Sequence, residues 1–213
     1  MELEAPRDTL GALERFYGER LGLSVAHAAG SLEVAAGDAE LAFSPAEGEA
    51  RPFYHFAFLV PGDRFEAANA WAGGESVFSF DFWDAEACYV HDPAGNIVEL
   101  IAHRGVGERD APGLPFSPDE ILGISEIGLV SRAPATSIET LARELGLPLW
   151  SGDASGLGFV GRKAHTLVVA SEGRGWLPTD RPAEVHPLGL VVEAGRDATA
   201  LLPEARARVR ARS

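Results

Sequence analysis

Hydrophobic and polar residues follow two different periods along this chain, and the alternation predicts three successive groups made of a strand, a helix and three strands. Apolar positions at helical spacing favour helices over residues 9–21, 63–72 and 136–145. Short apolar runs bounded by Gly, Pro, Asp and Asn predict the strands. These strands are expected at residues 2–7, 23–28, 31–36, 39–44, 53–60, 76–82, 85–91, 96–102, 124–131, 147–151, 156–161 and 165–171. This order of elements indicates an α+β fold.

A short motif recurs at a fixed distance and supports this division. Leu21–Leu23 (Leu-Gly-Leu) returns as Leu145–Leu147, 124 residues later, and each copy closes a predicted helix. The same offset carries Glu2 onto Glu126, and each stands 19 residues before its motif, at the start of a strand. Recurrence of one supersecondary unit is typical of a repeated architecture.

The last part of the chain reads as a shortened fourth module. A strand at 184–193 and a helix at 197–210 are expected there, so this module would lack three strands. Its arginines are interpreted as a solvated helix end or a frayed tail; they are Arg206, Arg208, Arg210 and Arg212. The predicted domains are residues 1–105 and 120–213, joined by a Gly/Pro/Asp-rich linker at 106–119.

Composition limits the classes of partner. The chain has 32 acidic and 18 basic residues, a formal net charge of −14, which argues against nucleic acid or an anionic membrane as a main partner. No apolar run is long enough to span a bilayer, and no signal peptide is recognised. The single cysteine, Cys88, excludes an intrachain disulfide and favours a reducing cytoplasm.

One carboxylate and one histidine stand out in otherwise apolar strands. The turn sequence Asp92–Asn96 (Asp-Pro-Ala-Gly-Asn) precedes a strand in which Glu99 is the only charge. A buried carboxylate needs a partner, a proton or a metal ion. His55 lies in the apolar strand 53–60, and its imidazole nitrogen together with a carboxylate oxygen suits first-row divalent ions. His55 and Glu99 are therefore predicted to share one face and one site.

The segments His55–Phe58 and Asp92–Glu99, together with Arg15–Leu23, resemble the vicinal-oxygen-chelate superfamily. That superfamily includes glyoxalase I, fosfomycin-resistance transferases, extradiol dioxygenases and bleomycin-resistance proteins. The resemblance implies repeated βαβββ modules that form cupped mixed or antiparallel sheets with helices outside. It also implies one metal ligand early in a module's first strand and another late in its last strand, positions that His55 and Glu99 occupy.

The resemblance leaves the third ligand open between two carboxylates. If the second and third modules pair, the metal set is His55, Glu99 and Glu126; if the first and second pair, Glu2 replaces Glu126. A fourth ligand late in the first module has no clean match. A second ligand histidine is also missing: His186 is out of phase, and the others are expected at the surface, namely His27, His91, His103 and His165.

Further residues are candidates for a substrate pocket. Phe78, Phe80 and Phe82 share a strand face that is predicted to pack under the helices, which would place Asp81 and Trp83 in the pocket. In the loop 172–182, Arg174 is a candidate anion contact and Trp176 a candidate apolar cap, and the alternative is a surface loop with a tucked Trp.

By resemblance, the expected function is a divalent-metal enzyme (Fe, Mn, Ni or Zn) acting on a small molecule with vicinal oxygens, of lyase, isomerase or dioxygenase type. The alternative is a metal-free small-molecule binding protein of the bleomycin-resistance type. A homodimer is compatible with either function, and the sequence does not identify the substrate.

Overall fold

The computed structural model describes residues 1–213, which divide into two compact units. The N-terminal unit is Ala5–Glu126, and the C-terminal unit consists of Met1–Glu4 together with Ile127–Ser213. The predicted domains 1–105 and 120–213 divide the chain by module rather than by compactness, and this division stays a prediction.

The first module begins with β1 (Glu2–Ala5) and continues into the N-terminal unit. A 3-10 turn, η1 (Arg7–Thr9), leads into α1 (Leu10–Glu14) and then into a π-helical turn, η2 (Arg15–Arg20). Apolar side chains at helical spacing are buried along this segment, as the sequence pattern predicts; they are Leu13, Phe16, Tyr17 and Leu21. The strands β2 (Ser24–Ala28), β3 (Ser31–Ala36) and β4 (Ala39–Pro45) form an antiparallel meander.

The repeated Leu-Gly-Leu motif marks the same helix ending in two modules. Gly22 and Gly146 have φ of 70° and 71°, a left-handed conformation that favours glycine. The next residue then donates its N–H back into the helix, Leu23 to the Tyr17 carbonyl at 2.9 Å and Leu147 to the Leu141 carbonyl at 3.4 Å. Such a bond satisfies a carbonyl that the helix end would otherwise leave open.

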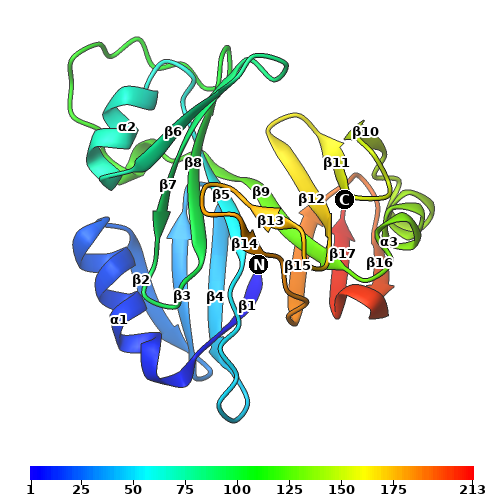
Figure 1. Cartoon of the computed structure of the whole chain (residues 1–213). Helices are drawn as coiled ribbons and strands as arrows, with labels where there is room; N and C mark the ends of the chain where they lie inside the picture. The colour runs from blue at the N-terminus through cyan, green and yellow to red at the C-terminus, as the bar shows by residue number, and fades with distance from the viewer. The chain divides into compact units, whose positions relative to one another are not determined.

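The second module supplies the sheet that holds the site. Its elements are β5 (His55–Val60), α2 (Phe65–Ala72), β6 (Glu75–Phe80), β7 (Ala85–His91) and β8 (Ile97–His103). The strand order is β5-β8-β7-β6, with β5 parallel to β8 and the other pairs antiparallel (Figure 1). All residues of β5 and β8 are buried, as expected for strands covered on both faces.

Helix α2 packs on one face of this sheet, against β7 and β8. Cys88 of β7 points to that face, because a Cβ built on Gly74, just after α2, would lie 2.6 Å from the Cys88 sulfur. Burial raises the pKa of the Cys88 thiol to about 12, so this cysteine is a core residue. Successive strand residues point to opposite faces, so Tyr89 lies on the face away from α2.

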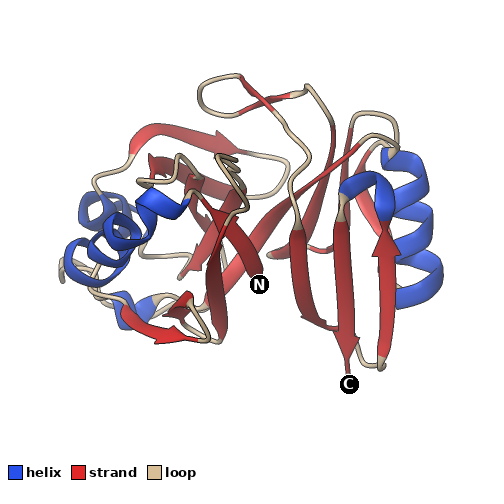
Figure 2. Cartoon of the chain, turned by 90° about the horizontal axis from the view of Figure 1, so that it is seen from below, coloured by secondary structure: helices blue, strands red, loops and turns tan.

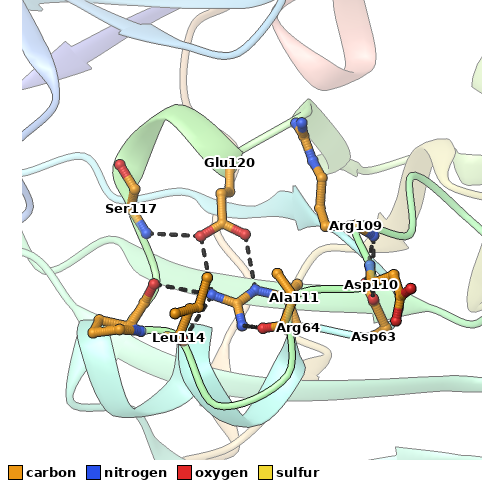
Figure 3. Close-up of polar contacts among 9 residues, drawn as sticks. Asp63, Arg64, Arg109, Asp110, Ala111, Leu114, Ser117 and Glu120 are labelled. Atoms are coloured by element: carbon orange, nitrogen blue, oxygen red, sulfur yellow. Dashed lines mark hydrogen bonds and ion pairs between the residues drawn. The ribbon is translucent and has the colours of Figure 1, made fainter.

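The predicted linker is held against the N-terminal unit by one arginine (Figure 3). The Arg64 guanidinium donates to both carboxylate oxygens of Glu120, at 2.8 and 3.1 Å. It also donates to three backbone carbonyls of the segment, those of Ala111, Leu114 and Pro115. The ion pair with Arg64 lowers the pKa of Glu120, which lies in the 3-10 turn η3 (Pro118–Glu120). Residues 106–119 thus follow a defined path.

The third module has the same element order as the first two. It comprises β9 (Gly123–Ser131), α3 (Pro134–Thr140) with its π-helical extension η4 (Leu141–Leu145), β10 (Leu149–Gly152), β11 (Leu157–Arg162) and β12 (His165–Ser171). The last three strands form an antiparallel meander, and α3 packs on β11 and β12. Three βαβββ groups are present, and the predicted α+β fold class is confirmed.

The prediction for the C-terminal residues was wrong. The chain ends in strands, drawn red in Figure 2, and no α-helix forms over 197–210. The elements are β15 (Leu188–Glu193), β16 (Ala198–Leu202), a 3-10 turn η5 (Pro203–Ala205) and β17 (Ala207–Arg212). Two strands therefore follow β15, and β17 pairs with β15 in parallel and with β16 in antiparallel orientation.

Three of the four arginines, Arg208, Arg210 and Arg212, form the exposed face of β17, and Arg206 follows the 3-10 turn η5 just before the strand. Ala207, Val209 and Ala211 are buried, and the arginines between and after them are exposed. A period of two is the signature of a half-buried strand. Before β15 the chain also forms a short two-stranded ribbon of β13 (Gly175–Trp176) and β14 (Arg181–Pro182). None of the helices is long and apolar enough to cross a membrane.

Candidate functional site

The structure brings His55 and Glu99 into direct contact. The Nε2 atom of His55 lies 2.9 Å from Oε2 of Glu99, and the two side chains are only 6% and 3% exposed. The parallel register of β5 and β8 explains the contact: Ala57 lies opposite Glu99, and His55 is two residues before Ala57 on the same face. The two residues form a buried polar pair in apolar strands.

The turn that precedes β8 sets the register of this pair. Asn96 accepts the Tyr54 backbone N–H on its side-chain oxygen at 2.8 Å, and Ile97 donates its N–H to the Tyr54 carbonyl at 2.8 Å. These two bonds fix the first residues of β5 against the first residues of β8. The turn motif in the sequence therefore also aligns the site.

The buried carboxylate of Asp92 organises the turn itself. It accepts hydrogen bonds from the Asn96 side-chain amide at 2.8 Å and from the backbone N–H groups of Ala94 and Asn96 at 2.9 and 3.0 Å. A further bond comes from the Tyr17 hydroxyl at 2.8 Å. Burial raises the pKa of Asp92, and these donors oppose the rise.

Tyr89 is a member of the site that the sequence analysis missed. It lies opposite Glu99 in the β7–β8 register, so both side chains share the face away from α2. The Tyr89 hydroxyl is hydrogen-bonded to Glu99, and its ring lies 6.5 Å from the His55 ring between centroids. Burial, and then the charges of Glu99 and Glu126, raise the pKa of Tyr89 far above its usual range. The sequence signal that could have found Tyr89 is its spacing from Ala85 and Ala87, which places the three side chains on one face of β7.

Glu126 is the second buried carboxylate of this group and is 5% exposed. Burial and then the charge of Glu99 raise its pKa well above the usual value, which favours its protonated form. Two carboxylates that are buried together do not both ionise readily unless a cation or a proton offsets the charge. His55, Glu99, Tyr89 and Glu126 all belong to the N-terminal unit.

Comparisons with known proteins agree with this architecture at the level of fold. No protein-family model matches the chain, and no curated protein matches it. A proposed dioxygenase from Bacillus subtilis subsp. subtilis str. 168 is similar over 80% of this chain, with a TM-score of 0.56 and 15% identity. The chain spans 62% of the length of that protein. This likeness shows that the present chain has the vicinal-oxygen-chelate fold.

Smaller structures align with about half of the chain. Lactoylglutathione lyase from Agrobacterium tumefaciens covers 51% of this chain and 96% of its own, with 22% identity and a TM-score of 0.40. The fosfomycin resistance protein FosX from Mesorhizobium loti covers 49% of this chain and 90% of its own, with 16% identity and a TM-score of 0.37. The match to the Bacillus subtilis protein, and not these smaller structures, confirms the vicinal-oxygen-chelate fold that the sequence motifs indicated, whereas the activity is not assigned.

Three of the candidate residues belong to the C-terminal unit, whereas His55 and Glu99 belong to the N-terminal unit. Glu2 is exposed on β1, opposite Gly189 of β15, and lies 3.7 Å from the Arg208 guanidinium. Trp176 is buried in β13, and the Arg174 guanidinium donates to the Gly175 carbonyl at 2.9 Å. A role of Glu2, Arg174 and Trp176 in the site stays a prediction.

The predicted orientation of the phenylalanine stripe was wrong. Phe78 and Phe80 lie opposite Ala87 and Ala85 of β7, on the same sheet face as Tyr89 and away from α2. Phe82 is not in the strand but in the turn after β6, where it is 70% exposed. The stripe therefore lies on the face of the site and not beneath the helices.

Asp81 and Trp83, the two other pocket candidates, lie in the same turn. Asp81 is exposed, whereas Trp83 is buried and packs against Phe80, Phe82 and His103. His103 was expected at the surface, but it is 1% exposed, and its ring lies 6.3 Å from the Trp83 ring between centroids. Its Nε2 atom lies 3.4 Å from the Ser125 hydroxyl. The other three histidines of that group are exposed, as predicted; they are His27, His91 and His165.

No group of three His, Cys, Asp or Glu side chains in this chain is arranged so that it could hold a metal ion. The donor types nevertheless suit a divalent first-row ion, because one imidazole nitrogen and two carboxylates lie buried in one region. Burial, and then the charge of Glu99, raise the pKa of Glu126, so a cation or a proton would offset the charge there. The chemistry of the donors fits a divalent ion.

Proposed function

We propose that this chain is a divalent-metal-dependent enzyme that acts on a small molecule with adjacent oxygen atoms, with His55, Glu99 and Glu126 as its metal ligands. The observation that supports it is the second buried carboxylate, Glu126, whose pKa is raised by burial and by the charge of Glu99. A purely structural His–Glu pair has no need of a second buried acid beside it.

A divalent ion (Fe, Mn, Ni or Zn) would act there as a Lewis acid toward two substrate oxygens or would activate dioxygen. Binding requires that Glu126 give up its proton and that His55 present a neutral nitrogen. The Tyr89 hydroxyl would hold the Glu99 carboxylate in orientation, as hydrogen-bonded partners of ligands commonly do. The low exposure of these side chains keeps bulk water away from the reacting atoms.

A metal-free small-molecule binding protein, of the kind that confers bleomycin resistance, is the second candidate. One observation favours it: His55 and Glu99 already satisfy each other at 2.9 Å, and a protonated Glu126 completes a group that needs no ion. We propose a cytoplasmic location for either activity, since the only cysteine, Cys88, is a buried free thiol.

Metal analysis separates the two functions. The full chain would be expressed without a polyhistidine tag, purified without chelator, and examined by elemental analysis and by calorimetric titration with Mn²⁺, Ni²⁺ and Zn²⁺. We expect about one ion per chain, and an affinity at least roughly tenfold lower in Glu126→Gln and His55→Ala. Glu2→Gln is the matched control, because it changes an exposed glutamate of the C-terminal unit.

The metal-dependent function is rejected if the wild type binds no ion, or if its affinity is unchanged in both ligand variants. Weakening by Glu2→Gln but not by Glu126→Gln would assign the third ligand to the first module instead. Binding of a small molecule that is insensitive to chelator would support the metal-free alternative.

A further inference from the structure

One sheet face of the C-terminal unit combines exposed arginines with large exposed apolar side chains. Arg208, Arg210 and Arg212 of β17 are exposed on this face. In the strand register, Leu201 of β16 lies opposite Arg208, and Val191 of β15 lies opposite Arg210. Leu201 is 65% exposed and Val191 is 44% exposed. Side chains that stand opposite each other share a sheet face, so these five residues form one surface, here called the arginine face.

The opposite face of the same strands is the covered one. Its side chains are buried, among them Ala200 of β16 and Val209 of β17. The third helix, α3 with its extension η4, packs on β16. Successive strand residues point to opposite faces, so the helix and the arginines lie on opposite sides of this sheet.

The arginines are only weakly neutralised within the chain. The Arg208 guanidinium lies 3.7 Å from the Glu2 carboxylate, in an exposed pair that contributes little. Neither Arg210 nor Arg212 forms an ion pair within the chain. Like charges that stand close together on one sheet face repel each other, so an acidic partner would stabilise the arginine face.

The charge of the chain is divided unevenly between the two units. The N-terminal unit has 21 acidic and 7 basic residues and therefore carries the whole formal net charge of −14. The C-terminal unit has 11 acidic and 11 basic residues and is formally neutral. Every copy of the chain thus brings an acidic unit that complements the arginine face of another copy.

The turn between β6 and β7 supplies the two kinds of group that such a partner needs. Phe82 is 70% exposed there, and Asp81 and Asp84 on either side are exposed carboxylates. Asp84 forms only an exposed ion pair with Arg104, at 3.3 Å. Trp83 of the same turn is buried and anchors it to the N-terminal unit. The segment Asp81–Asp84 is here called the acidic turn.

We propose that the arginine face of one copy of the chain binds the acidic turn of a second copy. Phe82 would pack against Leu201 and Val191, and the carboxylates of the turn would pair with the arginines. The contact joins two different surfaces, so it is heterologous. It goes beyond the proposed function and does not depend on a metal ion.

The composition of the arginine face favours a protein partner over a free anion. Apolar groups surrounded by charged groups are typical of a protein interface, which has an apolar centre and a polar rim. A nucleic acid or a small anion would pair with the arginines but would leave Leu201 and Val191 without an apolar partner. A net charge of −14 also disfavours a polyanion and leaves an acidic protein surface of the same chain as the complement.

Sedimentation velocity of the full chain over a concentration series tests this proposal. We expect self-association at low NaCl concentration that weakens at high NaCl concentration, because salt screens exposed ion pairs. Arg210→Glu and Asp81→Arg should each weaken the association at least about tenfold, since each substitution places like charges opposite one another. Both positions are exposed, so neither substitution alters the core of its unit.

A mixture of the two variants separates this contact from other modes of association. Arg210→Glu keeps the acidic turn and Asp81→Arg keeps the arginine face, so the equimolar mixture should associate although each variant alone does not. Arg162→Glu is the matched control, because Arg162 is an exposed arginine of β11 in the same unit. Its self-association should equal that of the wild type.

A wild type that stays monomeric at low NaCl concentration, up to the limit of its solubility, would overturn the proposal. Association that persists in both variants, or a mixture that associates no more than its components, would do the same. If the monomeric wild type instead binds heparin and Arg210→Glu does not, the arginine face recognises a polyanion and the second copy is rejected.

Discussion

The hydroxyl of Tyr17 donates a hydrogen bond of 2.8 Å to the buried carboxylate of Asp92. The contact joins the helical segment of the first module to the turn of the second module, 75 residues further along the chain. Because that turn aligns β5 with β8, the contact supports the site without touching it. The Tyr17 hydroxyl is one of the donors that stabilise the charged Asp92 carboxylate, whose pKa is raised by burial.

Tyr17→Phe should therefore destabilise the protein. The substitution keeps the ring but leaves one lone pair of a buried carboxylate without its donor, at a cost of about 1–3 kcal/mol. Urea denaturation measures the difference. Asp8→Asn is the control, because its ion pair with Arg51 is exposed and its loss should cost no more than about 1 kcal/mol. Equal losses in the two variants would contradict this role of Tyr17.

Glu126 should make the stability of the metal-free protein depend on pH. Its pKa is raised in the folded protein above the ordinary value of 4.5, so the folded state keeps a proton that the unfolded chain has lost. The free energy of unfolding should then fall as pH rises from about 4.5 toward the raised pKa. Denaturation over a pH series in the presence of chelator tests this, with Glu126→Gln as the comparison.

The glutamine variant should lose less stability over that interval, because it has no proton to release. Wild-type and variant curves that run parallel would show that Glu126 is not the group responsible.

Arg64→Ala should release the segment 106–119. The variant removes the donor to Glu120 and to three backbone carbonyls at once, so the segment loses the side chain that holds it to the unit. Limited proteolysis with trypsin should then cleave after Arg104 or Arg109 several-fold faster, as mass spectrometry can show. Arg132→Ala, which removes only an exposed pair with Glu172, should leave the cleavage rate unchanged. An unchanged rate in Arg64→Ala would mean that the segment is held by other contacts.

Tyr89→Phe tests the role of the missed tyrosine. The variant keeps the edge-to-face contact with Phe78 but removes the hydroxyl that is bonded to Glu99. If the hydroxyl orients a metal ligand, metal affinity should fall roughly tenfold, with thermal stability changed little. Unchanged metal affinity would mean that Tyr89 contributes only packing and does not orient Glu99.

The turns and helix ends of this fold could be predicted from the sequence. The strand faces that contact distant elements could be predicted only in part. The turn Asp92–Asn96 and the Leu-Gly-Leu endings are readable because each requires particular residues at particular backbone angles. The contact of His55 with Glu99 follows once strand parity is combined with the parallel order of the strands. Tyr89 was missed because a tyrosine in an apolar strand resembles an ordinary core residue.

Two errors have a common physical origin. The arginines of β17 recur at every second residue, a strand pattern, but their charge favoured the interpretation of a solvated end. The phenylalanines of β6 show which residues share a face, but not which face the helix covers. A register shift between Glu75 and Phe78 also breaks the strand's phase. Such assignments depend on contacts with distant elements, which a local pattern does not contain.

The parallel pairing of β5 with β8 has a consequence for how such a site can change. His55, Glu99 and the turn that aligns them all come from one module, so two of the proposed ligands stay in place whatever residue stands at position 126. The identity of the third group can be exchanged by a single substitution on another strand, with no strand rebuilt. A neutral, acidic or imidazole side chain at that one position would give the same scaffold a different charge, and with it a different choice of ion or none.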